Sequence, residues 1–190
     1  CRHRLFVVAV FASGFIYAGL MVDLSSSAFV YIEMLGIPRQ YFGFIFLTSV
    51  AGYMLGSGVS ARLTSKLDEE HIVLLGASLA AGASAIMWIG AWLLPENLWV
   101  LVLPMVFYAT GMGLLLPNAM ATALRPFPHM AGTASALLGF IQMGLSASAT
   151  ALVGAFLKTT PAPMLNFMVA VTGLALVLAL LLYRLSQRAS

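Results

Sequence analysis

Six long apolar stretches, each separated from the next by a short break, set the first limit on what this chain can fold into. They cover roughly residues 5–32, 41–61, 72–94, 98–124, 131–157 and 163–183. A helix needs about 20 apolar residues to cross the hydrocarbon core of a bilayer, and every stretch reaches that length. The breaks contain the proline, glycine and charged residues at which helices end. The sequence therefore predicts six membrane-spanning helices.

The composition agrees with this prediction and excludes other classes of protein. Hydrophobic residues make up 62% of the 190 residues and charged residues only 8%, with a mean hydropathy of +1.01. Soluble domains contain about 25% charged residues. A single cysteine, Cys1, excludes an internal disulfide and the clustered thiols of a structural zinc site. The predicted fold class is an all-α integral membrane protein, embedded in lipid and without a metal.

The basic residues divide unequally between the two sets of breaks. The N-terminus, the second and fourth breaks and the C-terminus contain Arg2, Arg4, Arg62, Lys66, Arg125, Arg184 and Arg188. Only Arg39 and Lys158 lie in the other breaks. Because an excess of Lys and Arg marks the cytoplasmic side of a membrane protein, both termini are predicted to lie in the cytoplasm. The same distribution accounts for the net charge of +3 without a nucleic-acid partner.

Small residues at helical spacing predict where the helices approach one another closely. The second stretch contains Thr48, Gly52, Gly56 and Ser60, and the fifth contains Gly132, Ser135, Gly139, Gln142, Ser146 and Ala149. Membrane helices associate through close backbone contact, which small side chains permit, so both stripes are expected to face other helices or a cavity. Pro117 interrupts the backbone hydrogen bonds of the fourth stretch and predicts a bend there.

Two segments resemble a known family. They are "SSSAFVYIEMLGIPRQYFGFIF", residues 25–46, and "PFPHMAGTASALLG", residues 126–139. Together they resemble the C-terminal half of the Bcr/CflA group of drug:proton antiporters, within the major facilitator superfamily. In that group the seventh helix ends in a similar "FVYIE" turn, and the eleventh begins with a similar "HMAGTASAL". The resemblance covers nearly the whole chain, which begins with Cys1 rather than methionine and is interpreted as a piece of a longer protein.

The resemblance implies one half of a twelve-helix major facilitator fold in the inner (plasma) membrane of a bacterium. The missing N-terminal half of six helices would be the partner of this chain. Small hydrophobic, drug-like compounds would bind between the halves and leave the cell by alternating access, in exchange for protons. The coupling ion would be the proton, with no other cofactor.

Asp23 is the acid that the six predicted helices place inside the bilayer. A charged side chain near the bilayer centre costs about 2.5–3.5 kcal/mol, so such residues usually face the bundle interior or a water-filled path. Asp23 shares a helical face with Ser26 and Ser27. A carboxyl group in this position can gain and lose a proton, which makes Asp23 the candidate for proton coupling. Two other roles for Asp23 are possible. Its side chain could be hydrated at the outer mouth of the bundle, or it could cap a local unwinding of the helix at the three serines.

Polar and aromatic residues within the spans are candidates for the substrate cavity. They are Tyr17, Ser27, Tyr31, Gln142 and Ser146. Aromatic rings offer flat contact area to varied hydrophobic compounds, and the Gln142 amide can donate and accept hydrogen bonds. The alternative role for the tyrosines is packing between helices. The alternative role for Gln142 is a hydrogen bond to another helix.

A proton-coupled multidrug efflux transporter is therefore the first functional hypothesis. A carrier of another substrate, such as a metabolite or sugar, is the second, and a half that is inactive alone is the third. An enzyme is not expected, because the sequence contains no nucleophile beside a base and no glycine-rich loop that would hold phosphate.

Overall fold

The structure, a computed structural model, describes residues 2–95, 97–157 and 160–187. It contains six long helices: α1 (Arg2–Ala28), α2 (Arg39–Leu63), α3 (Glu69–Leu93), α4 (Trp99–Leu124), α5 (Ala131–Phe156) and α6 (Ala162–Gln187). A π-helical segment, η1 (Phe29–Met34), extends α1, and a 3-10 turn, η2 (Pro128–Met130), precedes α5. No strand occurs among the described residues. Six helices are long and apolar enough to cross a membrane, which confirms the predicted fold class.

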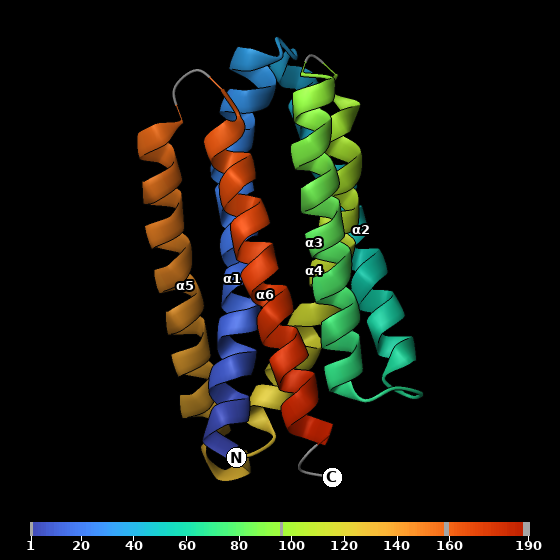
Figure 1. The fold of residues 1–190 in the computed structure, drawn as a ribbon, viewed down its shortest axis with the longest axis vertical. Helices are drawn as coiled ribbons and strands as arrows, with labels where there is room; N and C mark the ends of the chain where they lie inside the picture. The colour runs from blue at the N-terminus through green and yellow to red at the C-terminus, as the bar shows by residue number, and fades with distance from the viewer. Residues whose placement is uncertain (1, 96, 158–159, 188–190) are drawn as a thin grey trace.

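The helices form a bundle in which the start of α1 and the end of α6 lie at the same end (Figure 1). We call this the basic end, which also contains residues 64–68 and 125–130. The opposite end contains residues 35–38, Leu94, Pro95, Asn97 and Pro161. Arg4, Arg62, Lys66, Arg125 and Arg184 lie in or beside the basic end. Lys158 and Arg188, which also entered the prediction of orientation, lie outside the described residues. Cys1 lies outside them as well.

α4 lies at the centre of one side of the bundle, packed against α2, α3 and α1. α1 packs in turn against α5 and α6, and α3 against α6. α5 and α2 therefore form the two edges of the bundle in Figure 1. Within the most apolar window of each helix, 11% of the residues of α2 and 22% of those of α5 are buried, against 61% in α4.

Glycines let the backbones of α2, α3 and α4 touch. A Cβ atom on Gly56 would collide with the backbone of Thr110, and one on Gly76 would lie 2.5 Å from the carbonyl oxygen of Gly111. Ser60, one turn after Gly56, accepts a hydrogen bond from Asn118 at 2.6 Å. The close approach predicted from the stripe on the second stretch is thus observed. Pro117 lies within α4, which remains one continuous helix.

The stripe predicted on the fifth stretch is divided in the structure. Ser146 and Ala149 are buried, whereas a Cβ atom on Gly132 or Gly139 would meet nothing within 4 Å. The basic-end half of α5 thus presents its small residues to empty space, because no other helix of this bundle reaches them.

An ion pair at the basic end joins α3 to α4, so the acidic residues at the start of α3 are not a freely solvated loop. Glu70 is 2% exposed, and its carboxylate accepts a hydrogen bond from Arg125 at 2.8 Å. Glu69 lies 3.9 Å from the same guanidinium and accepts a hydrogen bond from Thr122. The two glutamates occupy the first turn of α3, so the contacts join the start of α3 to the end of α4. Sequence spacing gave no sign of this pairing, because the partners lie in different breaks.

Replacement of Gly56 tests the backbone contact between α2 and α4. Gly56→Leu should lower the thermal unfolding midpoint of the purified protein in detergent, because overpacking costs about 1–3 kcal/mol even where neighbours can move. The matched control is Gly58→Leu on the same helix, where a Cβ atom meets nothing within 4 Å. Equal midpoints for the two variants would contradict the proposed contact.

Removal of the Arg125 guanidinium tests the ion pair. Arg125→Ala leaves the buried Glu70 carboxylate without this partner, which should cost about 1–3 kcal/mol. The estimate is at the low end of values for buried pairs, because Arg125 is 56% exposed and partly screened. The same thermal measurement applies, with the exposed Arg62→Ala as control, and Glu70→Gln added to Arg125→Ala should recover part of the loss.

Candidate functional site

Asp23 lies in the last third of α1 and is only 8% exposed. Its Oδ1 atom has no hydrogen-bond partner, and no basic side chain of the described residues forms an ion pair with it. Tyr31 and Tyr108 lie within electrostatic reach of the carboxyl group. The phenol of Tyr108 is committed elsewhere, because it donates to the Ile16 carbonyl oxygen at 2.7 Å. Asp23 is therefore a buried acid without a counter-charge.

A small cavity adjoins this carboxyl group, which we call the Asp23 cavity. Its lining comes from α1, η1, α2 and α4 and consists of Asp23, Ser27, Tyr31, Phe42, Ile45, Phe46, Ser49, Val102 and Met105. The volume is about 10 Å³, which is at the lower limit for one water molecule. Sites for drug-sized ligands measure about 300–1,000 Å³. The cavity is therefore suited to a proton or a single small molecule such as water, and it is too small for a drug.

Two of the five predicted cavity residues, Ser27 and Tyr31, lie beside Asp23. The three residues are spaced by four along α1 and η1, so they share one helical face. The hydroxyl of Ser27 donates to the Leu24 carbonyl oxygen at 3.3 Å, which leaves its lone pairs free to accept. Tyr31 is 3% exposed, and its ring lies 6.2 Å from the ring of Phe42 on α2.

The other three predicted residues do not line the Asp23 cavity. Tyr17 is partly buried on α1, six positions before Asp23 and thus on a different face. Ser146 is buried on α5 and donates its hydroxyl to the Gln142 carbonyl oxygen at 2.7 Å. The Gln142 side chain is partly buried and makes no hydrogen bond among the described residues. Their assignment to a substrate cavity stays a prediction.

The local unwinding considered at Ser25 to Ser27 does not occur in α1, and hydration of Asp23 stays an open alternative. The helix continues through Ser25 to Ser27, where the hydroxyls of Ser25 and Ser27 bond to carbonyl oxygens of the preceding turn. The irregular segment is η1, which begins two residues later.

Sequence reasoning missed the residues that α2 and α4 contribute to the cavity. Ser49 supplies the hydroxyl across from α1, and Phe42, Phe46 and Met105 supply apolar walls. Ser49 lies in "FLTSVAG" among other small residues, and one serine in such a segment has no distinguishing signal. Its relevance follows only from the packing of α2 beside α1.

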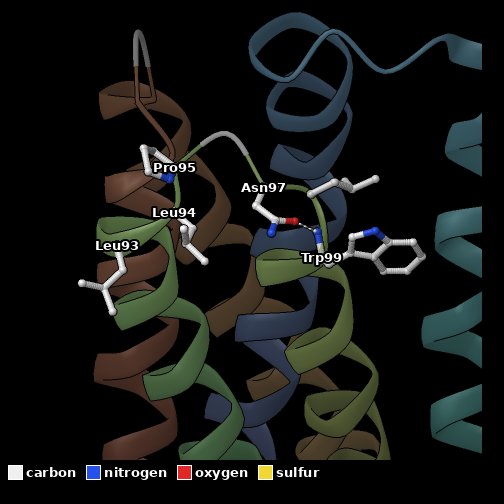
Figure 2. A pocket seen from close by; sticks show the side chains of 6 residues that line it. Leu93, Leu94, Pro95, Asn97 and Trp99 are labelled. Carbon is white, nitrogen blue, oxygen red and sulfur yellow. Dashed lines mark hydrogen bonds between the residues drawn. The ribbon is translucent and has the colours of Figure 1, made fainter.

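A larger hollow lies at the opposite end, on the surface formed where α3 leads into α4. It measures about 600 Å³ and is lined by Leu93, Leu94, Pro95, Asn97, Leu98 and Trp99. Figure 2 shows the Asn97 amide turned back to the start of α4, where its oxygen accepts from the Trp99 backbone amide at 3.0 Å. Leu93 and Trp99 are mostly exposed. Among the described residues that line this hollow, Asn97 has its amide oxygen bonded to the backbone, and the other side chains are mainly apolar.

No group of three or more His, Cys, Asp or Glu side chains that could hold a metal ion occurs in the described part of the chain. His129 lies in the η2 turn, directly before α5.

Comparison with known proteins adds the family. The chain is 31% identical over 175 residues to a bicyclomycin resistance protein homolog of Haemophilus influenzae, and 30% identical over 172 residues to multidrug resistance protein D of Escherichia coli. It is 28% identical over 174 residues to an uncharacterized transporter of the major facilitator type from Bacillus subtilis. These alignments cover 92%, 90% and 90% of the chain, but only 42%, 40% and 43% of the relatives.

The chain thus spans less than half the length of the curated relatives that it matches. The first two relatives agree with the resemblance to Bcr/CflA-type transporters that the two sequence segments indicated. The family model described as Major Facilitator Superfamily matches residues 1–151. With six long apolar helices in the structure, this match establishes that the chain belongs to the major facilitator superfamily.

Proposed function

We propose that this chain is the C-terminal half of a proton-coupled multidrug efflux transporter, which exports small hydrophobic compounds by alternating access. Two relatives named for resistance to bicyclomycin or to multiple drugs support the substrate class. The coverage of about two fifths of each relative supports a second half of similar size. The resemblance of residues 25–46 and 126–139 to the seventh and eleventh helices supports the assignment to the C-terminal half.

The observation that supports proton coupling best is the state of Asp23. A buried carboxylate without a hydrogen bond or counter-charge is strongly unfavourable, so the neutral, protonated acid is the form that suits this surrounding. The ionised form requires water or a positive partner to reach Oδ1. Because the cavity has room for one water molecule at most, release of the proton must accompany a structural change. A proton bound and released in this way is what coupling to transport needs.

The substrate would bind outside the Asp23 cavity, between the two halves. The edge helices α2 and α5 expose large apolar side chains such as Phe44, Phe140 and Met143. These faces would meet the missing half where they point to the centre of the transporter, and lipid elsewhere. Gln142 and Ser146 on α5 and Tyr17 on α1 are our candidates for its lining. The glycines of α5 that meet no neighbour, Gly132 and Gly139, would allow the other half to approach closely.

Location and orientation follow from the charge distribution. The basic end would face the cytoplasm of a bacterium, with the chain in the inner membrane, because excess Lys and Arg remain on that side. The three tryptophans Trp88, Trp92 and Trp99 lie near the opposite end, where indole rings suit the interface between lipid and water.

The role of Asp23 is tested by Asp23→Asn in the full-length transporter, reconstituted into vesicles. Asparagine keeps the size of the side chain and cannot exchange a proton, so proton movement driven by drug should be lost while drug binding remains. Asp68→Asn is the matched control, since that side chain is 79% exposed at the basic end. Unchanged proton movement in Asp23→Asn would remove this residue from the coupling path.

The position of the missing half is tested by Gly139→Leu on α5. A leucine there fits this bundle without collision, so the level of the protein in the membrane should be unchanged. Drug resistance of a pump-deficient strain should fall, because the added side chain would hold the halves apart. The control is Gly173→Leu on α6, which also meets nothing within 4 Å. Full resistance with Gly139→Leu would place the other half elsewhere.

A further inference from the structure

η1 and the start of α2 lie side by side over the Asp23 cavity. α1 with η1 ends at Met34 and α2 begins at Arg39, both at the opposite end of the bundle. Asp23 precedes Met34 by eleven residues and Ser49 follows Arg39 by ten, so at about 1.5 Å per residue both lie roughly 15 Å from that end. Tyr31 and Phe42 each lie three residues from these helix ends, about one turn deep.

The Tyr31–Phe42 ring pair therefore lies between Asp23 and the opposite end. Both rings line the Asp23 cavity, and their centroids are 6.2 Å apart with planes inclined by 50°. Tyr31 is 3% exposed, so its ring is covered by its neighbours on this side of the cavity. Ser27 lies between the ring pair and Asp23 on the same helical face.

η1 has empty space on its other side. A second cavity of about 160 Å³, which we call the vestibule, is lined by Val30, Met34 and Leu35 and, across from them, by Leu94, Pro95 and Pro161. η1 thus lies between the small Asp23 cavity and a roomier one at the opposite end. The vestibule offers space beside η1, and a shift of η1 in that direction would move Tyr31 away from Phe42.

The backbone of η1 is suited to such a shift. A π-helix has a less regular hydrogen-bond ladder than an α-helix and often marks a functional position. The segment ends in two hydrogen bonds, from Leu35 to the Val30 carbonyl and from Ile37 to the Tyr31 carbonyl, each 3.0 Å. Gly36 follows with φ of +66° and no atom within 4 Å of the position of a Cβ atom. That φ favours glycine and provides a joint between η1 and α2.

We propose that η1 is a movable cap on the Asp23 cavity, closed by the contact between Tyr31 and Phe42. In the closed form shown by the structure, Asp23 is separated from the opposite end. In the open form η1 occupies part of the vestibule, and a proton reaches Asp23 past Ser27. Access thus changes by movement within one half of the transporter. The inference rests on the proposed proton-coupling role of Asp23.

Accessibility of a cysteine at position 27 tests the cap. The full-length transporter with its other cysteines replaced would bear Ser27→Cys, and a membrane-impermeant thiol reagent would be applied from the side of the opposite end. Modification should be slow with the native rings. Phe42→Ala should raise the rate about twofold to tenfold, the range expected for the loss of one aromatic pair. Tyr31→Ala should act in the same way, and Tyr31→Phe, which keeps the ring, should not.

Phe44→Ala on the same helix is the control, since Phe44 is 66% exposed and should leave the rate unchanged. The cap is overturned if the thiol at position 27 is modified at the same rate with Phe42→Ala as with both native rings, in protein that retains its thermal unfolding midpoint. Thiol modification does not depend on proton transfer. Faster modification in Phe42→Ala therefore supports the cap even where Asp23→Asn shows intact proton movement, and the failure of the two proposals can be told apart.

Discussion

Backbone contact between α4 and its neighbours is the constraint on which the rest of the bundle depends. Helices in lipid gain little from burying apolar side chains, since lipid is equally apolar, so they associate where their surfaces approach closely. Gly56 of α2 and Gly76 of α3 each lie against the backbone of α4. α4 tolerates two prolines within this packing, because neighbouring helices cover its interrupted ladder. The positions of α2 and α1 beside α4 then decide which side chains surround Asp23.

Asp23 stands apart from the other acids that are buried in the bundle. Glu70 is more deeply buried but is paired with Arg125, so its charge is compensated and its role is structural. Asp23 has neither a basic partner nor a hydrogen bond at Oδ1. The two acids differ in their partners because they lie at different depths in the bundle. Glu70 lies at a helix end, within reach of an arginine from a loop. Asp23 lies where the described side chains nearby are apolar, hydroxylic or phenolic.

Much of the fold was predictable from the order of residues alone. The six apolar stretches overlap the six helices, and the four-residue spacing of Gly52 and Gly56 indicated a close approach to another helix or a cavity. Such features are local, since each helix satisfies its own backbone and its length is set by the membrane. The buried state of Glu70 was not predictable, because it depends on Arg125, 55 residues away. The same holds for Ser49 and Phe42, whose importance arises only when α2 lies beside α1.

The sequence by itself determined that this chain crosses a membrane six times, that its ends lie together, and that one acid is placed within the apolar helices. These properties depend on hydropathy and helix length, which act along the chain. Only the tertiary structure decided that Asp23 faces α2 and α4 in a cavity of about 10 Å³, away from Gln142 and Ser146. It also decided that Tyr31 meets Phe42 above that cavity. Helix rotation and pairing set these relations, and both result from side-chain packing between segments far apart in sequence.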